Sequence, residues 1–277
     1  MTSTDSLAPA QPQPHALNVG FQWREASRDG LRAVSPAQID QFKADGFFVF
    51  RDAFTPAEIA AVTAAIDPLE QATDTWVREE KGGRHRLSTT GAITFSAHIV
   101  TQSPVLQAFA RHPTIQAICR DLIGDDVRLY WDQSVYKKTQ VPQEFPWHQD
   151  NGYTFIEPQQ YLTLWIPLVD VDEENGCPWV APELHRMGTL EHWITDIGLV
   201  CLNSAPEAEP APARAGDIVV FSSLAPHRTG PNLKKDTVRK AYILQYAPDG
   251  AVTTLADGQV VTQSDPTRQF AILEGGA

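Results

Sequence analysis

The first part of the chain has the residue spacing of amphipathic helices with capped starts. Ser35-Pro36-Ala37-Gln38 and Thr55-Pro56-Ala57-Glu58 each fit a capping box, in which a hydroxyl and a side chain three residues later satisfy free backbone N–H groups. The first predicts a helix that ends near Asp45-Gly46, and the second predicts a helix that runs to about Gln71. The second helix carries an apolar stripe at helical spacing, formed by Ile59, Val62 and Ile66.

Further elements are expected around these helices. Residues 46–50 are apolar and predict a buried strand. Residues 73–102 are mixed and polar, and a loop is expected within them. Ser103-Pro104 and His112-Pro113 each place proline at a first helical position and predict two more helices, which end by residue 124.

From residue 127 onward the pattern changes to short apolar or alternating runs separated by Gly and Pro. Helices followed by strands indicate an α+β domain with a mainly β core. Several short strands with tight turns are typical of a double-sheet jelly roll, here with the N-terminal helices packed outside. The expected strands are 127–137, 145–150, 161–168, 177–181, 217–222 and 239–247.

The rest of the domain organisation follows from composition. Residues 1–20 are rich in Pro, Gln, Ser and Ala and predict a flexible tail, or an arm ordered only by docking. We expect one domain over 21–277. A long insertion at about 171–215 contains a Pro- and Ala-rich stretch at 205–213 and is a candidate lid, because long irregular insertions often cover substrate sites.

Overall composition narrows the functional class. The 277 residues are 42% hydrophobic and 20% charged, which allows a sizeable core, and the net charge is −12. That charge disfavours nucleic acid and anionic membranes as partners. The absence of a signal-like start and of a long apolar run favours a cytoplasmic protein that acts on a small molecule as a monomer or homodimer. Buried, inert thiols are expected for its three cysteines: Cys119, Cys177 and Cys201.

Candidate chemistry begins at Trp147-His148-Gln149-Asp150. His148 and Asp150 are two positions apart, so on a strand they face the same way. A distant third ligand is offered by His227, which follows the apolar strand at 217–222. Two imidazoles and one carboxylate are the ligands of a mononuclear non-heme Fe(II) site with open positions. A single histidine or a lone His-x-Asp is more often structural, so the surrounding sequence must decide whether these residues bind a metal.

The surrounding sequence resembles the phytanoyl-CoA dioxygenase family of Fe(II)- and 2-oxoglutarate-dependent oxygenases over roughly residues 40–247. The resemblance rests on the order and spacing of four blocks. These are Trp147–Asp150, Leu164–Leu168 through Glu174–Cys177, Gly216-Asp217 with the following strand, and His227–Asn232 through Arg239–Ala241.

The resemblance implies a double-stranded β-helix, with Fe(II) bound inside one end by His148, Asp150 and His227. O2 and 2-oxoglutarate would be co-substrates, the latter held at its distal carboxylate by Arg239 and Thr229. The reaction implied is hydroxylation with release of succinate and CO2. Further co-substrate contacts are implied on two strands: Thr163, Trp165, Gln133 and Lys137. A shift of one position would exchange Lys137 for Lys138.

Substrate contacts are less closely defined. Side chains near the ligands and in the insertion are candidates, and the basic loop at 81–86 is either solvated or a contact for an anionic substrate group. The segment 181–185 lacks the Gly-Ser turn frequent in the family. Asp150 disfavours a halogenase, but a halogenase, a cupin-type enzyme and a non-catalytic metal-binding module stay open as alternatives. The candidate substrate residues are Gln149, Asn151, Tyr153, Trp179 and His185.

Overall fold

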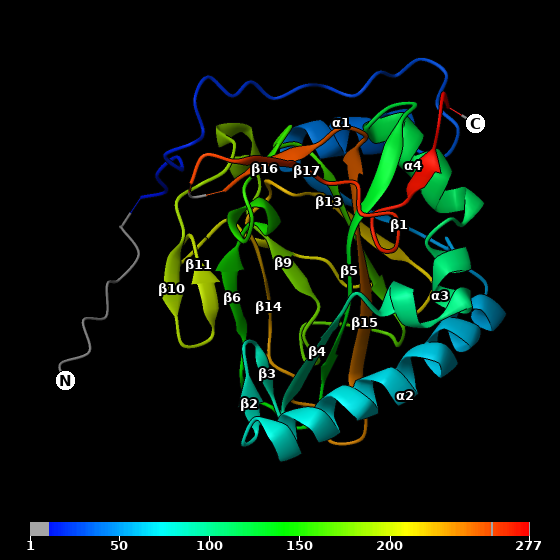
Figure 1. Ribbon diagram of the computed structural model, residues 1–277, viewed down its shortest axis with the longest axis vertical. Coiled ribbons are helices and arrows are strands. Elements are labelled where there is room, and N and C mark those ends of the chain that lie inside the picture. The colour runs from blue at the N-terminus through cyan, green and yellow to red at the C-terminus, as the bar shows by residue number, and fades with distance from the viewer. Residues whose placement is uncertain (1–10, 256, 277) are drawn as a thin grey trace.

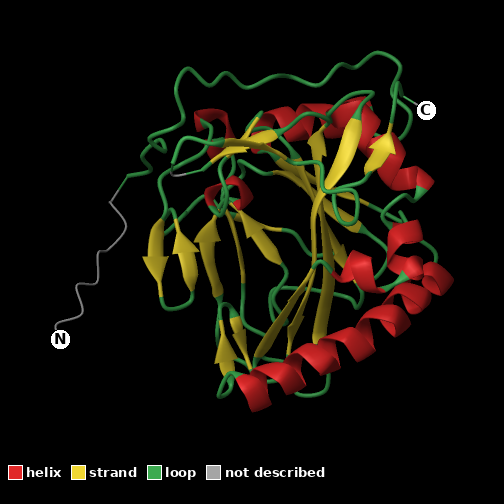
Figure 2. Ribbon diagram, viewed as in Figure 1, coloured by secondary structure: helices red, strands yellow, loops and turns green. Residues whose placement is uncertain are grey.

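The chain folds as two antiparallel β-sheets that face each other, with the helices packed against the outer side of the larger one (Figures 1 and 2). The computed structural model describes residues 11–255 and 257–276. The greater part of the predicted tail, residues 1–10, lies outside the described residues. The predicted mainly β fold with helices outside is confirmed.

Both predicted capping boxes are present. Ser35 caps α1 (Pro36–Asp45) and Thr55 caps α2 (Pro56–Glu80), each with the side chain three residues later returning a bond to the cap backbone. The positive φ of 80° at Gly46 ends α1 where the sequence predicted. The helices predicted after the proline signals are α3 (Pro104–Phe109) and α4 (Pro113–Leu122).

The predicted end of α2 near Gln71 is wrong, because the helix continues to Glu80. Its last turns are polar but contain no strong helix-breaking residue, and tertiary contacts hold them. Glu70 is buried and its Oε1 lies 2.6 Å from the ammonium of Lys138, while Val77 packs into the interior. The helix therefore lies along the sheet beside β4 (Ile93–Ala97), as Figure 1 shows.

The larger sheet carries most of the candidate site. Within the described residues its strands run in the order β1-β13-β8-β15-β5-β4-β3-β2, with β18 also paired to β5. All these pairs are antiparallel, as expected for a jelly roll. Besides β4, the bounds are β1 (Phe47–Phe50), β2 (Arg84–His85), β3 (Ser88–Thr89), β5 (Val127–Lys137), β8 (Leu162–Pro167), β13 (Ile218–Ser222), β15 (Arg239–Pro248) and β18 (Ala271–Leu273).

The smaller sheet closes the other side in the order β12-β9-β14-β6. Its strands are β6 (Phe145–His148), β9 (Pro178–Val180), β12 (Glu209–Pro210) and β14 (His227–Thr229). Outside the two sheets, β10 (Trp193–Thr195) and β11 (Gly198–Val200) form a hairpin. A separate three-stranded ribbon consists of β7 (Ile156–Glu157), β16 (Val252–Thr254) and β17 (Val260–Thr262). The 3-10 turns are η1 (Ile99–Gln102), η2 (Asp150–Gly152) and η3 (Leu184–Met187).

Side-chain alternation divides the interior into two cores. Tyr242 and Leu244 on β15 face the helices, whereas Ala241 and Ile243 face the smaller sheet. Burying a side chain of the size of Leu244 or Ile243 stabilises the fold by roughly 1.5–3 kcal/mol. The helix-side core anchors the larger sheet, and its other face is free to carry the site.

Strands with clear alternation match their predictions, and β5 has the predicted bounds of 127–137. The loop predicted at 81–86 is confirmed only in part, because residues 81–83 form a turn but Arg84 and His85 form β2. The rest of the mixed segment 73–102 contains the end of α2, β3, β4 and η1. The strand predicted at 145–150 ends at His148, because Asp150 begins η2. The residues of β2 and β3 are polar, so the apolar pattern of the sequence did not predict these short strands.

The chain ends and the insertion make further contacts. In the predicted tail, the backbone of His15 bonds to Thr189 and its ring stacks on Phe155 with centroids 4.9 Å apart. The insertion supplies β9 and β12 to the smaller sheet, and Figure 1 shows its β10–β11 hairpin beside β6. Over the described residues, no helix is both long and apolar enough to cross a bilayer. The cysteines are buried and free, as predicted.

Candidate metal centre

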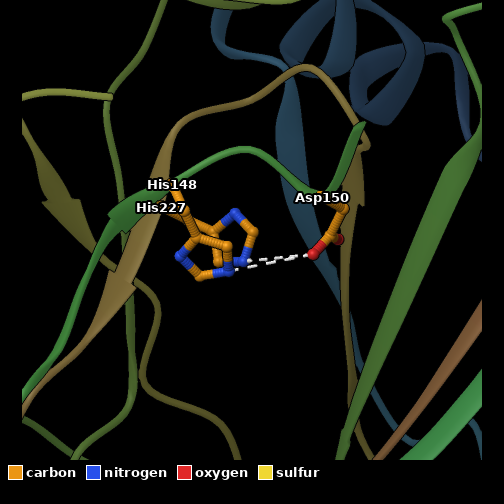
Figure 3. A group of neighbouring side chains, drawn as sticks. All are labelled: His148, Asp150 and His227. Atoms are coloured by element: carbon orange, nitrogen blue, oxygen red, sulfur yellow. Dashed lines mark ion pairs between the residues drawn. The ribbon is translucent and has the colours of Figure 1, made fainter. Parts of the chain in front are cut away.

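His148, Asp150 and His227 converge on one point between the two sheets (Figure 3). His148 on β6 pairs directly with His227 on β14, so their rings lie side by side. Asp150 follows β6 in η2, and its Oδ1 lies 3.8 Å from Nε2 of His148 and 3.9 Å from Nε2 of His227. One donor atom from each residue lies within 4.8 Å of the others, a spacing that a single metal ion can bridge.

Both imidazoles are held ready to coordinate. Nδ1 of His148 lies 2.8 Å from the carbonyl of Pro146, and Nδ1 of His227 lies 3.0 Å from that of Ala225. Each carbonyl accepts the Nδ1 hydrogen, which leaves the Nε2 lone pair directed at the centre. Burial lowers the pKa of His148 to about 3 and that of His227 to about 4, so both rings are neutral near pH 7.

Asp150 is fixed by the larger sheet. Its Oδ2 accepts a hydrogen bond from the hydroxyl of Thr163 on β8. Burial raises the pKa of Asp150, while His148 and hydrogen bonds from Thr163 and Gln245 act in the opposite direction. Thr163 and Gln245 are cross-strand neighbours on β8 and β15, so the two groups reach the carboxylate from one patch of sheet. A bound cation would complete the stabilisation of the ionised carboxylate.

A narrow inner cavity extends from the triad to Arg239 on β15. The Arg239 side chain is fully buried, and Nη1 donates to the carbonyl of Val135 at 3.2 Å. Among the described residues, Nε and Nη2 of Arg239 have no hydrogen-bond partner. Burial lowers the pKa of Arg239 to about 9, which still leaves it cationic at neutral pH. Thr229 and Trp165 also line this cavity, and the Trp165 ring lies 5.5 Å from the guanidinium carbon.

Lys137 places a second basic side chain next to Arg239. The two residues are directly paired across β5 and β15, and Lys137 is buried while Lys138 points outward to Glu70. The ammonium of Lys137 donates to the carbonyls of Thr229 and Gly230 at 3.1 and 2.5 Å. Burial and the charge of Arg239 lower its pKa well below the usual range. Lys137 thus braces the loop that carries Thr229, and it is absent from the inner cavity lining.

A larger outer cavity of about 460 Å³ lies on the other side of the metal ligands. His148, Asp150, Gln133, Phe95 and Phe145 line both cavities, so two of the three metal ligands lie at the boundary between them, whereas His227 lines the inner cavity. The outer wall is largely aromatic: Phe145 lies 4.7 Å and Tyr153 5.5 Å from the His148 ring, centroid to centroid. The volume suits a small organic molecule.

The structure brings together most of the sequence-predicted site residues. His148, Asp150, His227, Thr163, Trp165, Gln133, Thr229 and Arg239 line the inner cavity, and Tyr153 lines the outer one.

Four candidate substrate contacts are placed elsewhere. The Gln149 amide bonds to the backbone of Gly188, Leu190 and Leu224, and Asn151 bonds to Thr189 and Ile156, so both are framework residues. Their position beside the ligands in the sequence suggested otherwise, but the strand ends at His148 and the chain turns there. Trp179 packs beside Arg228, and the buried His185 lies against Trp23 and Lys43. None of these four is in either cavity lining.

Sequence reasoning missed several cavity residues. Gln245 was recoverable, because Arg239, Ile243 and Gln245 share one face of β15 by alternation. Phe95 was missed with the strand that carries it. Tyr130, Trp131 and Phe145 had no local signal that separated them from core aromatics.

Comparison with known proteins agrees with this geometry. Residues 42–241 match the family described as phytanoyl-CoA dioxygenase (PhyH), which is well over half of the chain. A curated relative, phytanoyl-CoA dioxygenase domain-containing protein 1 of Rattus norvegicus, is 26% identical over 261 residues, covering 76% of this chain and 89% of the rat protein.

Solved structures share the architecture. EctD from S. alaskensis with 2-oxoglutarate and 5-hydroxyectoine has a TM-score of 0.64 at 21% identity, covering 88% of this chain and 85% of that one. The epimerase SnoN in complex with Fe3+, alpha ketoglutarate and nogalamycin RO has a TM-score of 0.62 at 21% identity, covering 78% of this chain and 84% of that one. The likeness confirms the predicted double-stranded β-helix.

Proposed function

Because the chain belongs to the phytanoyl-CoA dioxygenase family, we propose that it is an Fe(II)- and 2-oxoglutarate-dependent dioxygenase that hydroxylates a small organic molecule. The observation that carries this proposal is that one cavity joins a possible metal-ligand set to a buried arginine with unused hydrogen-bond donors. A buried His-Asp-His triad lies at one end, and a buried arginine with two partnerless nitrogens lies at the other. EctD was crystallised with 2-oxoglutarate and SnoN with Fe3+ and alpha ketoglutarate, which supports the same ligands here.

The donor set fits the metal. Two neutral imidazoles and one carboxylate are the ligands that mononuclear non-heme Fe(II) takes while leaving positions open. Bound iron and 2-oxoglutarate supply the oxidising chemistry, in which the substrate C–H bond, O2 and 2-oxoglutarate give the alcohol, succinate and CO2. The protein's part is to hold the ligands, exclude water and position the substrate.

The inner cavity fits 2-oxoglutarate. Its distal carboxylate would accept hydrogen bonds from Nε and Nη2 of Arg239, a planar match that also neutralises a buried cation. We infer that the hydroxyl of Thr229 donates to the same carboxylate and that Trp165 forms a wall beside it, because both residues line this cavity. Thr163 and Gln245 keep the Asp150 carboxylate oriented, while backbone carbonyls keep both imidazoles in one tautomer.

The open alternatives are less well supported. Asp150 occupies the position that a halogenating site must leave free for halide, so hydroxylation is favoured over halogen transfer. A cupin-type site would add another histidine ligand, and the metal-ligand cluster among the described residues contains only His148 and His227. A non-catalytic module has no need for a buried Arg239 with unused donors.

Turnover of 2-oxoglutarate tests the proposed function. Protein supplied with Fe(II), ascorbate and 2-oxoglutarate should consume O2 and release succinate slowly without substrate, and faster with a substrate found by screening. Asp150→Ala should lose both activities. Iron-loaded wild-type protein that releases no succinate over a broad compound panel would contradict the proposal, and halide incorporation into a product would replace it with the halogenase alternative.

A further inference from the structure

The β2–β3 hairpin places one arginine at the rim of the outer cavity. His85, Arg86, Leu87 and Ser88 all line this cavity, together with the aromatic wall beside the metal ligands. The Arg86 side chain is exposed, and no hydrogen bond or ion pair joins its guanidinium to any residue that the structure describes. It is therefore an available cation beside a catalytic cavity in a chain with a net charge of −12.

Other residues in and around the hairpin are already engaged. Arg84 donates to the backbone carbonyl of Asp196 in the β10–β11 hairpin. The hydroxyl of Ser88 accepts from the backbone N–H of Phe95 at 2.9 Å, and the His85 ring packs edge-on against Trp76 at 4.9 Å. These contacts fix the hairpin against both neighbours. The Arg86 side chain has no such structural contact.

The turn geometry gives no reason for arginine at this position. His85 pairs with Ser88, which leaves a two-residue turn, and Arg86 has a φ of 49°. Such left-handed positions in tight hairpins favour Gly, Asn or Asp, and other side chains adopt them at a conformational cost. Asparagine would adopt this left-handed turn conformation at a lower conformational cost than arginine. A role for the guanidinium outside the turn explains its presence.

The rest of the cavity wall defines what this cation would meet. Tyr130, Trp131, Phe145 and Tyr153 give the wall an aromatic surface. The carboxylate in the lining is that of Asp150, which the metal site uses. Leu199 donates its backbone N–H to the Tyr153 hydroxyl at 3.3 Å, so the β10–β11 hairpin supports this wall from outside. The cavity therefore has an apolar body, with an unpaired cation at its rim.

We propose that Arg86 binds a carboxylate of the substrate, whose apolar or aromatic body packs against Phe145 and Tyr153 beside the metal. This inference rests on the proposed function, because it names the substrate class of the same site. The planar guanidinium and the carboxylate form a two-pronged pair, which fixes one end of the molecule while its other end lies over the reacting centre. The substrate class is a small organic acid with an apolar skeleton, distinct from the 2-oxoglutarate held by Arg239.

The test compares matched acids and amides. Arylalkyl carboxylates with two- to five-carbon chains and their primary amides are titrated anaerobically into protein loaded with Fe(II) and 2-oxoglutarate, and tryptophan fluorescence reports binding, since Trp131 lines the cavity. At least one acid should bind about tenfold more tightly than its amide, the size expected for a hydrogen-bonded charge. Arg86→Asn suits the turn and should abolish this preference, whereas Arg86→Lys should restore part of it.

Control variants separate the two proposals. Arg78→Gln removes an exposed charge from α2, outside the lining of the outer cavity, and should keep the preference for the acid. Equal binding of acids and amides, no binding by any acid, or a preference that survives in Arg86→Asn would overturn the inference. If Arg86→Asn releases succinate in the absence of substrate, the proposed function stands, whatever the acids and amides show about substrate binding. Wild-type protein that releases no succinate with or without the panel compounds counts against the proposed function, whereas wild-type protein that releases succinate but shows no preference for the acid counts against this inference.

Discussion

Thr163 donates its hydroxyl hydrogen to the carboxylate of Asp150, across the space between the two sheets. Thr163 belongs to β8 of the larger sheet, and Asp150 follows β6 of the smaller one. The bond therefore ties the carboxylate proposed to bind the metal to the sheet that carries Arg239 and Trp165, which are proposed to contact 2-oxoglutarate. Supporting bonds of this kind orient metal ligands and raise metal affinity.

Thr163→Val should weaken metal binding while preserving shape. Loss of the hydroxyl removes an interaction that lowers the pKa of Asp150, and the carboxylate becomes harder to keep ionised. We expect Fe(II) affinity to fall by about tenfold to a hundredfold, as for other supporting bonds at metal sites. Anaerobic metal titration measures the change. Thr163→Ser should retain the affinity, as should Thr101→Val, which removes a remote exposed hydroxyl. Unchanged affinity in Thr163→Val would show that the bond does not support the metal.

Arg239→Met should weaken binding of 2-oxoglutarate. Hydrogen bonds to a charged group contribute roughly 1.5–3 kcal/mol, so the KM for 2-oxoglutarate should rise about tenfold to a hundredfold. Arg239→Lys should recover only part of the loss, because an ammonium cannot make the two-pronged contact.

The neighbouring residue on β15 supplies a matched control for this change. Lys240 points to the opposite face, where its ammonium lies 2.7 Å from a carboxylate oxygen of Asp67. Lys240→Met should therefore leave the KM unchanged. Initial rates of succinate release give both values. A KM that is the same in Arg239→Met and wild type would place the distal carboxylate elsewhere.

Buried histidines should make the metal-free protein acid-sensitive. Nε2 of His192 accepts a hydrogen bond from the backbone N–H of Gln149 at 2.9 Å. Protonation of His192 would place an Nε2–H donor opposite that N–H donor and break the bond. Burial lowers its pKa from 6.5 to about 4 in the folded state. Between these values the unfolded chain binds more protons, so stability is full above pH 6.5 and falls as the pH drops toward 4, by about 1.4 kcal/mol per pH unit for one histidine.

His192→Gln tests this acid sensitivity directly, because an amide oxygen can accept the same bond without titrating. Urea denaturation of chelated protein between pH 7.5 and 5 gives the free energy of unfolding. The free energy of unfolding should change less steeply with pH in His192→Gln than in the wild type, by about the contribution of one histidine. Equal slopes would mean that His192 titrates alike in both states.

Local sequence was sufficient for the parts of the site that lie on regular strands. Thr163 and Trp165 share a face of β8 as predicted, and Arg239 begins β15 with its side chain directed inward. In each case the alternation of a single strand determines the direction of the side chain.

Local sequence failed where the backbone leaves the strand or where a distant contact decides. Asp150 begins a 3-10 turn, and the amides of Gln149 and Asn151 bond to the framework, which their nearness to the ligands in the sequence did not indicate. The last turns of α2, beyond Gln71, include the buried Val77, whose packing against distant parts of the chain the local sequence did not indicate. The sequence alone could not show that Arg84 bonds to Asp196 while the guanidinium of nearby Arg86 has no bonding partner among the described residues.

The most direct measurement of the central claim is the visible absorption of protein mixed anaerobically with Fe(II) and 2-oxoglutarate. Bidentate binding of the keto acid to iron in the triad should give a weak charge-transfer band, with one iron per chain. Asp150→Ala and His227→Ala should lose the band, and Arg239→Met should require more 2-oxoglutarate to reach it. A folded, iron-loaded wild-type protein without the band, or a band that persists in both ligand variants, would contradict the assignment of His148, Asp150 and His227 as the iron site.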